Sequence, residues 1–457
     1  MRNTCKPADL VLQPSTGAPF FVPAGEYRTN ATAQDYLEEE WFATGHDDLG
    51  QPYTTQLVVR RPRDPARFSG VVIVEPLHIH RIAPIYMYCS PYILRSGHGW
   101  VCVAAQKTAL DAHVKTSDPE RYARLGIAPD TAYSLNATTD LTMPPFIGTD
   151  PATRKAWWDA FRHVNQATSA ILAQVGAALR TANGPFESSS VRHMILAGHS
   201  QTGFVTTNYI CNAHEAQRLT DGSPVFDGFF PSGWPRAPFG PCDVPILQVM
   251  SDGDISDPAF SFEPGFEGRR YRRDDADDPH DRYRLYELAG VPHSGTRYPP
   301  FSDPALWQQV ATAGTVPLGS VMNSLPHHEL FDMSLHHLVQ WVAHGATPPR
   351  ADRLALAPDD SIAKDGHGNS LGGVRCVQLD VPAATYYPNP LNPDGTRAFG
   401  TIGITVPFHV AEMQRLYGDP ATYVRQFVRR LEDLIHDGWF LPDDADEMRA
   451  EARARSW

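Results

Sequence analysis

The segment from Val191 to Gly203 constrains the fold of this 457-residue chain more than any other. A short apolar run, Met194–Ala197, leads into Gly198-His199-Ser200, and a segment of helical pattern, Phe204–Ile210, follows it. A strand, a sharp turn with serine at its apex and a helix make the layout of a nucleophile elbow. We therefore expect strained backbone at Ser200 and a hydroxyl that stands clear of a sheet.

The turn departs from the usual Gly-x-Ser-x-Gly pattern in one place. Thr202 stands where the second glycine is expected, and Gly203 comes one residue later. A Gly-x-Ser match is common in unrelated turns, so the rest of the chain must decide whether Ser200 is a nucleophile. The first N–H group of the following helix, that of Gln201, is predicted to face an oxyanion.

Apolar runs that alternate with helical patterns predict an α/β fold, with a mostly parallel sheet covered by helices on both faces. The expected strands are 55–60, 70–76, 100–105, 194–197, 225–230, 244–250 and 283–288. The expected helices are 85–94, 157–180, 204–210, 330–341, 421–436 and 445–455. We predict a core over residues 1–350, an irregular polar insertion over about 108–157, and a C-terminal extension over 351–457.

Two further predicted strands end in residues that can activate a serine, which needs a base and an acid to orient that base. The strand 244–250 leads into Ser251-Asp252-Gly253-Asp254, and the strand 283–288 leads into Ala289-Gly290-Val291-Pro292-His293. Serine, acid and histidine thus follow one another at strand ends. We predict His293 as the base and Asp254, deeper in its loop, as the acid, with Asp252 as the alternative acid.

The strand 71–74 is followed by residues that could complete the site. The N–H of Leu77 is predicted to be the second oxyanion donor, because Pro76 has none. His78 comes next, and it is predicted to line the pocket. Four aromatic or soft residues lie near predicted strand ends: Tyr86, Met87, Tyr88 and Trp234. They suggest a bulky apolar or aromatic substrate group, although core packing explains them equally well.

Composition limits the partners. A net charge of −13 without a basic stripe argues against nucleic acid and anionic membranes. No apolar signal core and no 18-residue apolar stretch is seen, so we expect a cytoplasmic protein, with a mature secreted form as the alternative. The six cysteines form no Cys-x-x-Cys pair and are interpreted mainly as small buried residues.

Three other motifs are interpreted as structural. The histidines in His78-Ile79-His80 and His327-His328-Glu329 lack the spacing of known zinc sites, so a loop pair and the start of a helix are favoured and no metal is predicted. A literal Gly-x-Ser-x-Gly occurs at Gly368-Asn369-Ser370-Leu371-Gly372. It follows a polar segment rather than a buried strand, so we interpret it as a flexible loop.

Several segments resemble the alpha/beta-hydrolase-domain proteins of bacteria and fungi, a group of serine esterases. They are Val71–Leu77, Gly99–Gln106, Ala197–Thr202, Tyr283–His293, His367–Arg375 and Val406–Phe408. Relatives often carry serine or threonine at the position of Thr202. At residues 74–78 the relatives usually read Val-Glu-Trp-Leu-Asn. This chain has Pro76 in place of the tryptophan and His78 in place of the asparagine.

The resemblance implies an alpha/beta-hydrolase fold with Ser200 as nucleophile and His293 as base, and it leaves Asp252 and Asp254 both open as the acid. It also implies that the last hundred residues belong to the enzyme and close over the active site, with Asn369 near the substrate. We therefore expect a carboxylic-ester hydrolase that acts on a small-molecule ester without a cofactor. The alternatives are a lactonase, thioesterase or amidase with the same residues, or a non-catalytic ligand-binding relative.

Overall fold

In a computed structural model, the described residues are 3–14, 19–23, 31, 34–128, 167–186, 190–234, 240–255, 272–295, 321–389, 391 and 401–457. The chain divides into two compact units. Unit 1 comprises residues 1–248, 259–283 and 338–347, and unit 2 comprises residues 249–258, 284–337 and 348–457. The predicted core, insertion and extension follow other boundaries and stay predictions.

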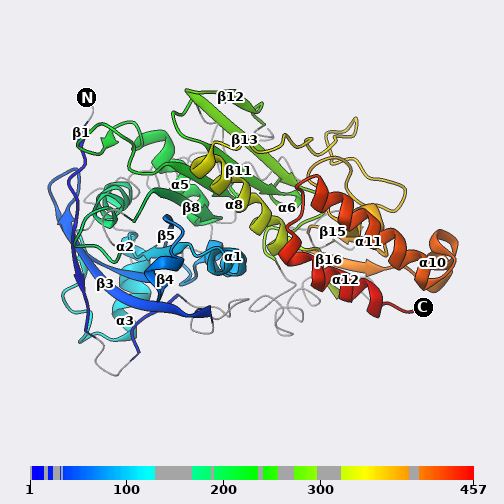
Figure 1. The fold of residues 1–457 in the computed structure, drawn as a ribbon, viewed down its shortest axis with the longest axis horizontal. Coiled ribbons are helices and arrows are strands. Elements are labelled where there is room, and N and C mark those ends of the chain that lie inside the picture. The colour runs from blue at the N-terminus through cyan, green and yellow to red at the C-terminus, as the bar shows by residue number, and fades with distance from the viewer. Residues whose placement is uncertain are drawn as a thin grey trace. The chain divides into compact units, whose positions relative to one another are not determined.

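The main sheet has the strand order β12-β13-β11-β10-β8-β5-β6-β4-β3-β2, and β7 pairs with β4 (Figure 1). Four neighbouring strands are parallel: β6 (Gly99–Val103), β5 (Val71–Pro76), β8 (His193–His199) and β10 (Gly228–Ser232). Their residues are almost all buried, which explains why strands with continuous apolar runs could be recognised in the sequence. The predicted parallel strands are confirmed, and their bounds differ from the predicted ones by at most three residues.

An antiparallel edge continues this sheet beyond β6. It contains β4 (Pro52–Pro62), β3 (Tyr36–His46), β2 (Asp9–Leu12) and β7 (Gly126–Ile127). At the other end lie β11 (Ile246–Ser251), β13 (Asp281–Leu288) and β12 (Ala276–Asp278), and β12 is antiparallel to β13. The short β1 (Asn3–Thr4) pairs in parallel with β9 (Gln217–Arg218) as a separate sheet.

Helices α1 (Pro84–Arg95) and α5 (Gln201–Asn212) pack on the parallel strands of unit 1. Residues 167–179 are helical, as predicted, and the earlier part of that predicted helix lies outside the described residues. The expectation of an irregular segment after residue 107 is wrong in its first part. There α2 (Lys107–Ala109), a π-helical turn η3 (Leu110–Val114) and α3 (Lys115–Ser117) follow one another, anchored by the buried Leu110 and Val114. The rest of the insertion, from residue 129, is not described.

Unit 2 contains a small sheet and most of the C-terminal helices (Figure 1). The sheet has the order β14 (Val321–Met322), β16 (Ile404–Pro407), β15 (Ala384–Tyr387), and it is antiparallel. The helices are α6 (Asp252–Ile255), α9 (Val377–Asp380), α10 (Val410–Tyr417), α11 (Pro420–His436) and α12 (Ala445–Ala454). Helix α8 (His327–His344) begins in unit 2 and ends in unit 1. Two short 3-10 helices, η2 (Pro65–Arg67) and η5 (Pro442–Asp444), also lie in the described part of the chain.

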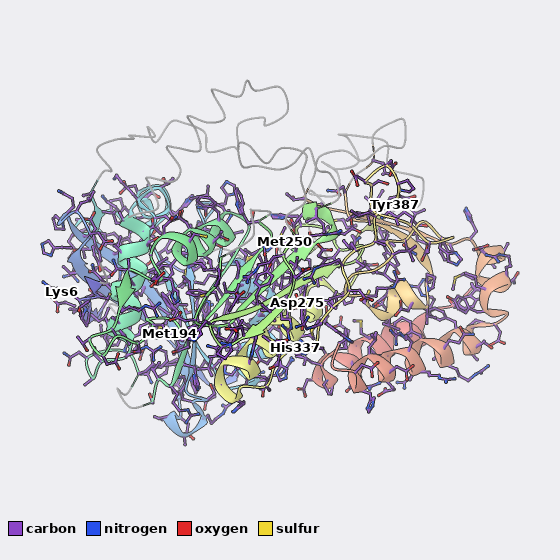
Figure 2. The ribbon with its side chains drawn as sticks, turned by 90° about the horizontal axis from the view of Figure 1, so that it is seen from above. Lys6, Met194, Met250, Asp275, His337 and Tyr387 are labelled. Carbon is purple, nitrogen blue, oxygen red and sulfur yellow. The ribbon has the colours of Figure 1, made fainter. Side chains whose placement is uncertain are left out.

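Helix α11 shows why the C-terminal helices form where the sequence predicts them. The Asp419 carboxylate accepts a hydrogen bond from the N–H of Thr422, and Pro420 occupies the first helical turn. One face of the helix is apolar and buried in a cluster with α9, α10 and α12. Figure 2 shows how side chains fill both units, for example around Met194 in β8 and Tyr387 in β15.

Candidate active site

The serine turn lies in unit 1, between β8 and α5 (Figure 1). Ser200 has φ 58° and ψ −125°, a conformation that costs a residue with a Cβ about 1–3 kcal/mol. Its N–H donates a 3.0 Å hydrogen bond to the carbonyl of Ser232, the last residue of β10. The strained turn expected at Ser200 is present, held between two adjacent parallel strands.

Two close approaches explain the order of small residues around the serine. A Cβ at Gly198 would lie 2.2 Å from the carbonyl oxygen of Thr202, and a Cβ at Gly203 would lie 2.1 Å from that of Ser232. The contact between α5 and β10 therefore falls at position 203, not 202. The Thr202 hydroxyl instead donates to the carbonyl of His199 and accepts from its N–H, at 2.9 and 3.0 Å. The departure from the usual motif thus has a local structural reason.

Gln201 is the first residue of α5, so its N–H has no acceptor one turn earlier in the helix. Its buried side chain forms two hydrogen bonds with Gln106, Nε2 to Oε1 in each direction, at 2.5 and 3.1 Å. Gln106 also donates to the carbonyl of Leu77, at 2.9 Å. Gln106 is not among the residues predicted for the site, since its only signal in the sequence is its place directly after a predicted buried strand.

The structure corrects the role expected of Leu77. Its N–H donates a 2.8 Å hydrogen bond to the carbonyl of Val103, because the pairing of β5 with β6 continues one residue beyond β5. The N–H therefore already has an acceptor and does not serve as the predicted oxyanion donor. The next N–H, that of His78, donates to the carbonyl of Ile82 at 3.0 Å.

The buried carboxyl group of Glu75, in β5, holds the start of α1. Glu75 accepts hydrogen bonds from the N–H groups of Ile85 and Tyr86 at the start of α1, at 2.7 and 3.1 Å, and from Trp100 Nε1 at 3.2 Å. Burial raises the pKa of Glu75 to about 8, and these three donors only partly offset that effect. Glu75 thus fixes α1 relative to β5 and β6.

The pocket residues expected in unit 1 are all buried. His78 accepts the N–H of His80 on Nδ1, at 3.0 Å. Tyr86 packs on Trp100, with ring centroids 4.4 Å apart, beneath the guanidinium of Arg60, and so belongs to the core. Trp234 meets Phe204 of α5 edge to face.

Tyr88, two residues after Tyr86 in α1, contacts the serine turn. Its ring meets that of His199 edge to face, with centroids 5.2 Å apart. The other side of His199 is fixed by a 3.1 Å hydrogen bond between Nδ1 and the Ser232 hydroxyl. The residue before the serine is therefore held by both α1 and β10.

An acid–histidine pair lies in unit 2. Asp254 Oδ1 and His293 Nδ1 are 2.5 Å apart, and Asp254 Oδ2 accepts the N–H of Ser251 at 2.7 Å. The Asp254 side chain is 3% exposed and that of His293 is 17% exposed. A carboxylate on Nδ1 places the proton there and leaves Nε2 as the basic nitrogen.

Asp252 lies two residues away but makes different contacts. It is fully buried, and its Oδ2 accepts hydrogen bonds from the N–H of Gly290, at 3.0 Å, and from the hydroxyl of Ser370. Of the two candidate acids, Asp254 is therefore the one that contacts His293. Asn369 is also buried in unit 2, where its amide donates to Ala384 O and accepts from Tyr386 N–H, so the geometry gives it a structural role.

His327 stands beside the acid–histidine pair as the first residue of α8, as the sequence predicts for a helix start. Its ring stacks on Phe331, with centroids 4.6 Å apart. Burial lowers the pKa of His327 to about 3, although the Asp254 carboxylate acts in the opposite direction. A neutral imidazole therefore neighbours the pair at physiological pH.

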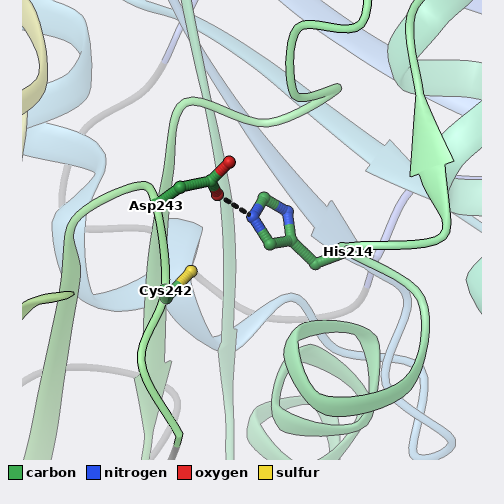
Figure 3. A group of neighbouring side chains, drawn as sticks. All are labelled: His214, Cys242 and Asp243. Carbon is green, nitrogen blue, oxygen red and sulfur yellow. Dashed lines mark hydrogen bonds and ion pairs between the residues drawn. The ribbon is translucent and has the colours of Figure 1, made fainter. Parts of the chain in front are cut away.

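One group of side chains in unit 1 has the residue types of a metal centre. Atoms of His214, Cys242 and Asp243 lie within 4.8 Å of one another (Figure 3). The Asp243 carboxylate forms hydrogen bonds with His214 Nε2, at 2.6 Å, and with Arg218 Nη1, at 2.8 Å. The hydrogen bond with His214 is the main cause of the strongly lowered pKa of Asp243. Burial raises the pKa of the Cys242 thiol to about 11. An arginine on the carboxylate and a protonated thiol fit an ion-pair network better than a metal site.

A comparison with protein families matches most of the chain to one family. The family described as "Alpha/beta hydrolase domain" matches residues 13–450. A comparison with curated proteins finds no match. The predicted fold class, a mostly parallel sheet flanked by helices, agrees with this family.

None of the described helices combines the length and the apolar character that a membrane span requires.

Solved structures give weaker likenesses. A ligand-bound form of the rice cell wall degrading esterase LipA from Xanthomonas oryzae is 11% identical, with 51% of each chain covered and a TM-score of 0.26. Lipase A of Candida antarctica is 11% identical over 52% of this chain and 44% of its own, with a TM-score of 0.26. A cold-adapted esterase from an Arctic intertidal metagenomic library is 10% identical over 63% and 94%, with a TM-score of 0.29. The chain thus spans about half the length of the first two, and the assignment rests on the family match.

Proposed function

The chain belongs to the alpha/beta hydrolase domain family, and from that premise we propose that it is a serine hydrolase of carboxylic esters. Ser200 is the proposed nucleophile, His293 the base and Asp254 the acid. The observation that carries the proposal is the backbone of Ser200, held at φ 58° at a strand–helix turn. A second observation supports the proposal: Asp254 and His293, both in unit 2, form a hydrogen bond.

In the proposed reaction, His293 Nε2 takes the proton of the Ser200 hydroxyl while Oγ attacks the ester carbonyl carbon. The C–O bond to the alcohol then breaks, and the alcohol leaves with the proton from His293. Water attacks the acyl-serine, gives its proton to Nε2 and releases the carboxylic acid, and Ser200 recovers its proton. Ester, water and side chains supply every atom, so the cycle requires no cofactor.

Two neighbouring groups have supporting roles in this proposal. Asp254 holds the Nδ1 proton of His293 and stabilises the imidazolium that forms at each transfer. The N–H of Gln201 stabilises the oxyanion, since it starts α5 without an intrahelical acceptor. An ester is preferred to an amide as substrate because an alkoxide is the better leaving group.

A fluorophosphonate probe tests the proposal directly. We expect covalent labelling of the wild type, located at Ser200 by peptide mapping, and none in Ser200→Ala. Ser361→Ala is the matched control, because Ser361 is exposed and its hydroxyl donates to Asp359 within the same turn. Hydrolysis of short and long acyl esters, thioesters, lactones and aryl amides should follow the labelling. A folded protein that binds these compounds but neither reacts with the probe nor turns any of them over would be a binding protein instead.

A further inference from the structure

The segment 364–375 contains the literal Gly-x-Ser-x-Gly sequence of the chain, Gly368–Gly372, which the proposed reaction does not use. It is not the flexible loop that the sequence suggested. Asp365 Oδ1 accepts the N–H groups of His367 and Asn369, at 2.8 and 2.9 Å, and Arg375 donates to the carbonyl of Ser370. Asn369 is tied to β15 through Ala384 and Tyr386. The segment therefore presents Ser370 from a fixed backbone.

Ser370 links this segment to the turn that carries the acid. Its hydroxyl donates to Asp252 Oδ2, and Lys364 Nζ donates to Ser370 Oγ at 2.5 Å. The Lys364 ammonium is 3.9 Å from the same Asp252 oxygen. Asp252 and Ser370 are both fully buried, so this short chain of contacts supplies the donors and the positive charge that a buried carboxylate requires.

Asp252 also contacts the segment that carries the histidine. Its Oδ2 accepts the N–H of Gly290, and the N–H of Gly253 donates to the carbonyl of Val291, both at 3.0 Å. His293 follows two residues later. One carboxylate therefore joins three stretches: the acid turn, the histidine segment and the region around Ser370.

We propose that Lys364 and Ser370 are positioning residues: through Asp252 they hold Asp254 and His293 in register for proton transfer. This inference rests on the proposed function for its catalytic consequence. A shift of less than 1 Å between base and acid is enough to slow proton transfer, so a rigid anchor beside the pair has a direct effect on rate. The acidic residues at 252 and 254 then have separate tasks, and the C-terminal region contributes to the site without contacting substrate.

Two substitutions test the proposal in the full-length protein. Ser370→Ala removes the hydroxyl, and Lys364→Met removes the ammonium from a side chain that is 30% exposed, which makes it the safer variant for folding. Each is expected to lower kcat for an ester about tenfold with KM nearly unchanged. Lys364 and Ser370 both act through Asp252, so the double variant should lose less activity than the product of the two single effects. Lys364→Arg, which keeps the charge, should restore most of the rate. Ser361→Ala, three residues before this segment, is the matched control.

Hydrogen exchange provides a second measurement that does not depend on activity. Amide exchange in residues 251–255 and 289–293 should be faster in Ser370→Ala and Lys364→Met than in the wild type and in Ser361→Ala. An active wild type with unchanged kcat in both variants would overturn the proposal, even if exchange is faster. If the wild type shows no Ser200-dependent hydrolysis, the proposed function fails, and exchange alone decides: unchanged exchange overturns the anchoring role, and faster exchange supports it.

Discussion

Asp254 and His293 approach to 2.5 Å, Oδ1 to Nδ1, although 39 positions separate them along the chain. The second carboxylate oxygen of Asp254 is bound by the N–H of Ser251, so the acid has little freedom to turn away. A fixed carboxylate sets which ring nitrogen carries the proton, and so leaves Nε2 of His293 as the basic atom.

Asp254→Asn should abolish most of the activity. The asparagine amide favours the wrong tautomer of His293, so we expect kcat to fall about 10³- to 10⁴-fold with little change in Tm. Steady-state ester hydrolysis and a thermal melt measure the two quantities. Asp252→Asn is the comparison: it should cost more stability and much less rate, and the reverse ranking would show that the acid has been assigned to the wrong residue.

Gln106→Leu should affect both stability and rate. The substitution leaves the Leu77 carbonyl and the Gln201 amide without their partner, so we expect a loss of about 1–3 kcal/mol in unfolding free energy. Gln201 then loses its orientation at the serine turn, and kcat should fall as well. Urea unfolding and ester hydrolysis measure the effects. Gln174→Leu, whose partners are Tyr53 and His46, is the control that should leave kcat unchanged.

Glu75 should make stability depend on pH. Its folded-state pKa, about 8, lies above the ordinary value of 4.5, so the folded chain binds the proton more tightly than the unfolded chain. This contribution to stability is complete below about pH 4.5 and is lost as the pH rises to about 8, with a slope of at most about 1.4 kcal/mol per pH unit. Urea unfolding of the wild type and Glu75→Gln between pH 5 and 8 measures it. A wild type that gains stability relative to the variant as pH rises would contradict the prediction.

Gly203→Ala should disrupt the serine turn. The added Cβ meets the Ser232 carbonyl at 2.1 Å, and neither backbone can move without separating α5 from β10. We expect a loss of about 3 kcal/mol in unfolding free energy, from chemical unfolding. At Gly240 a Cβ would have no described residue within 4 Å, so Gly240→Ala is the matched control. Equal stability of the two variants would show that the backbone can accommodate a Cβ between residue 203 and the Ser232 carbonyl.

The parallel strands and the order of Ser200, Asp254 and His293 could be predicted because each depends on a local signal. A buried strand is a continuous apolar run, and the proposed catalytic residues stand in the loops that follow such strands. Strand β3 had no such signal. Glu38 and Glu39 interrupt its pattern, and their charges are balanced by Arg60 and Arg61 on β4, which only the strand register brings together.

The errors near the site have the same origin. Whether the Leu77 N–H is available depends on a carbonyl of β6, and no pattern within the segment reveals it. The Gln106–Gln201 pair joins residues 95 positions apart, and the Ser370–Asp252 pair joins residues 118 positions apart. Pairings between buried polar side chains follow from the packed structure and leave no periodicity in the sequence.

The left-handed backbone at Ser200 also has a thermodynamic meaning. Glycine reaches this conformation without steric penalty, so folding alone would favour glycine at the apex, by about 1 kcal/mol or more. Serine at this position therefore makes the fold less stable than glycine would. A Ser200→Gly variant should therefore melt at a higher temperature than the wild type and lose its reactivity. Such a result would be a trade-off between stability and activity at a single residue.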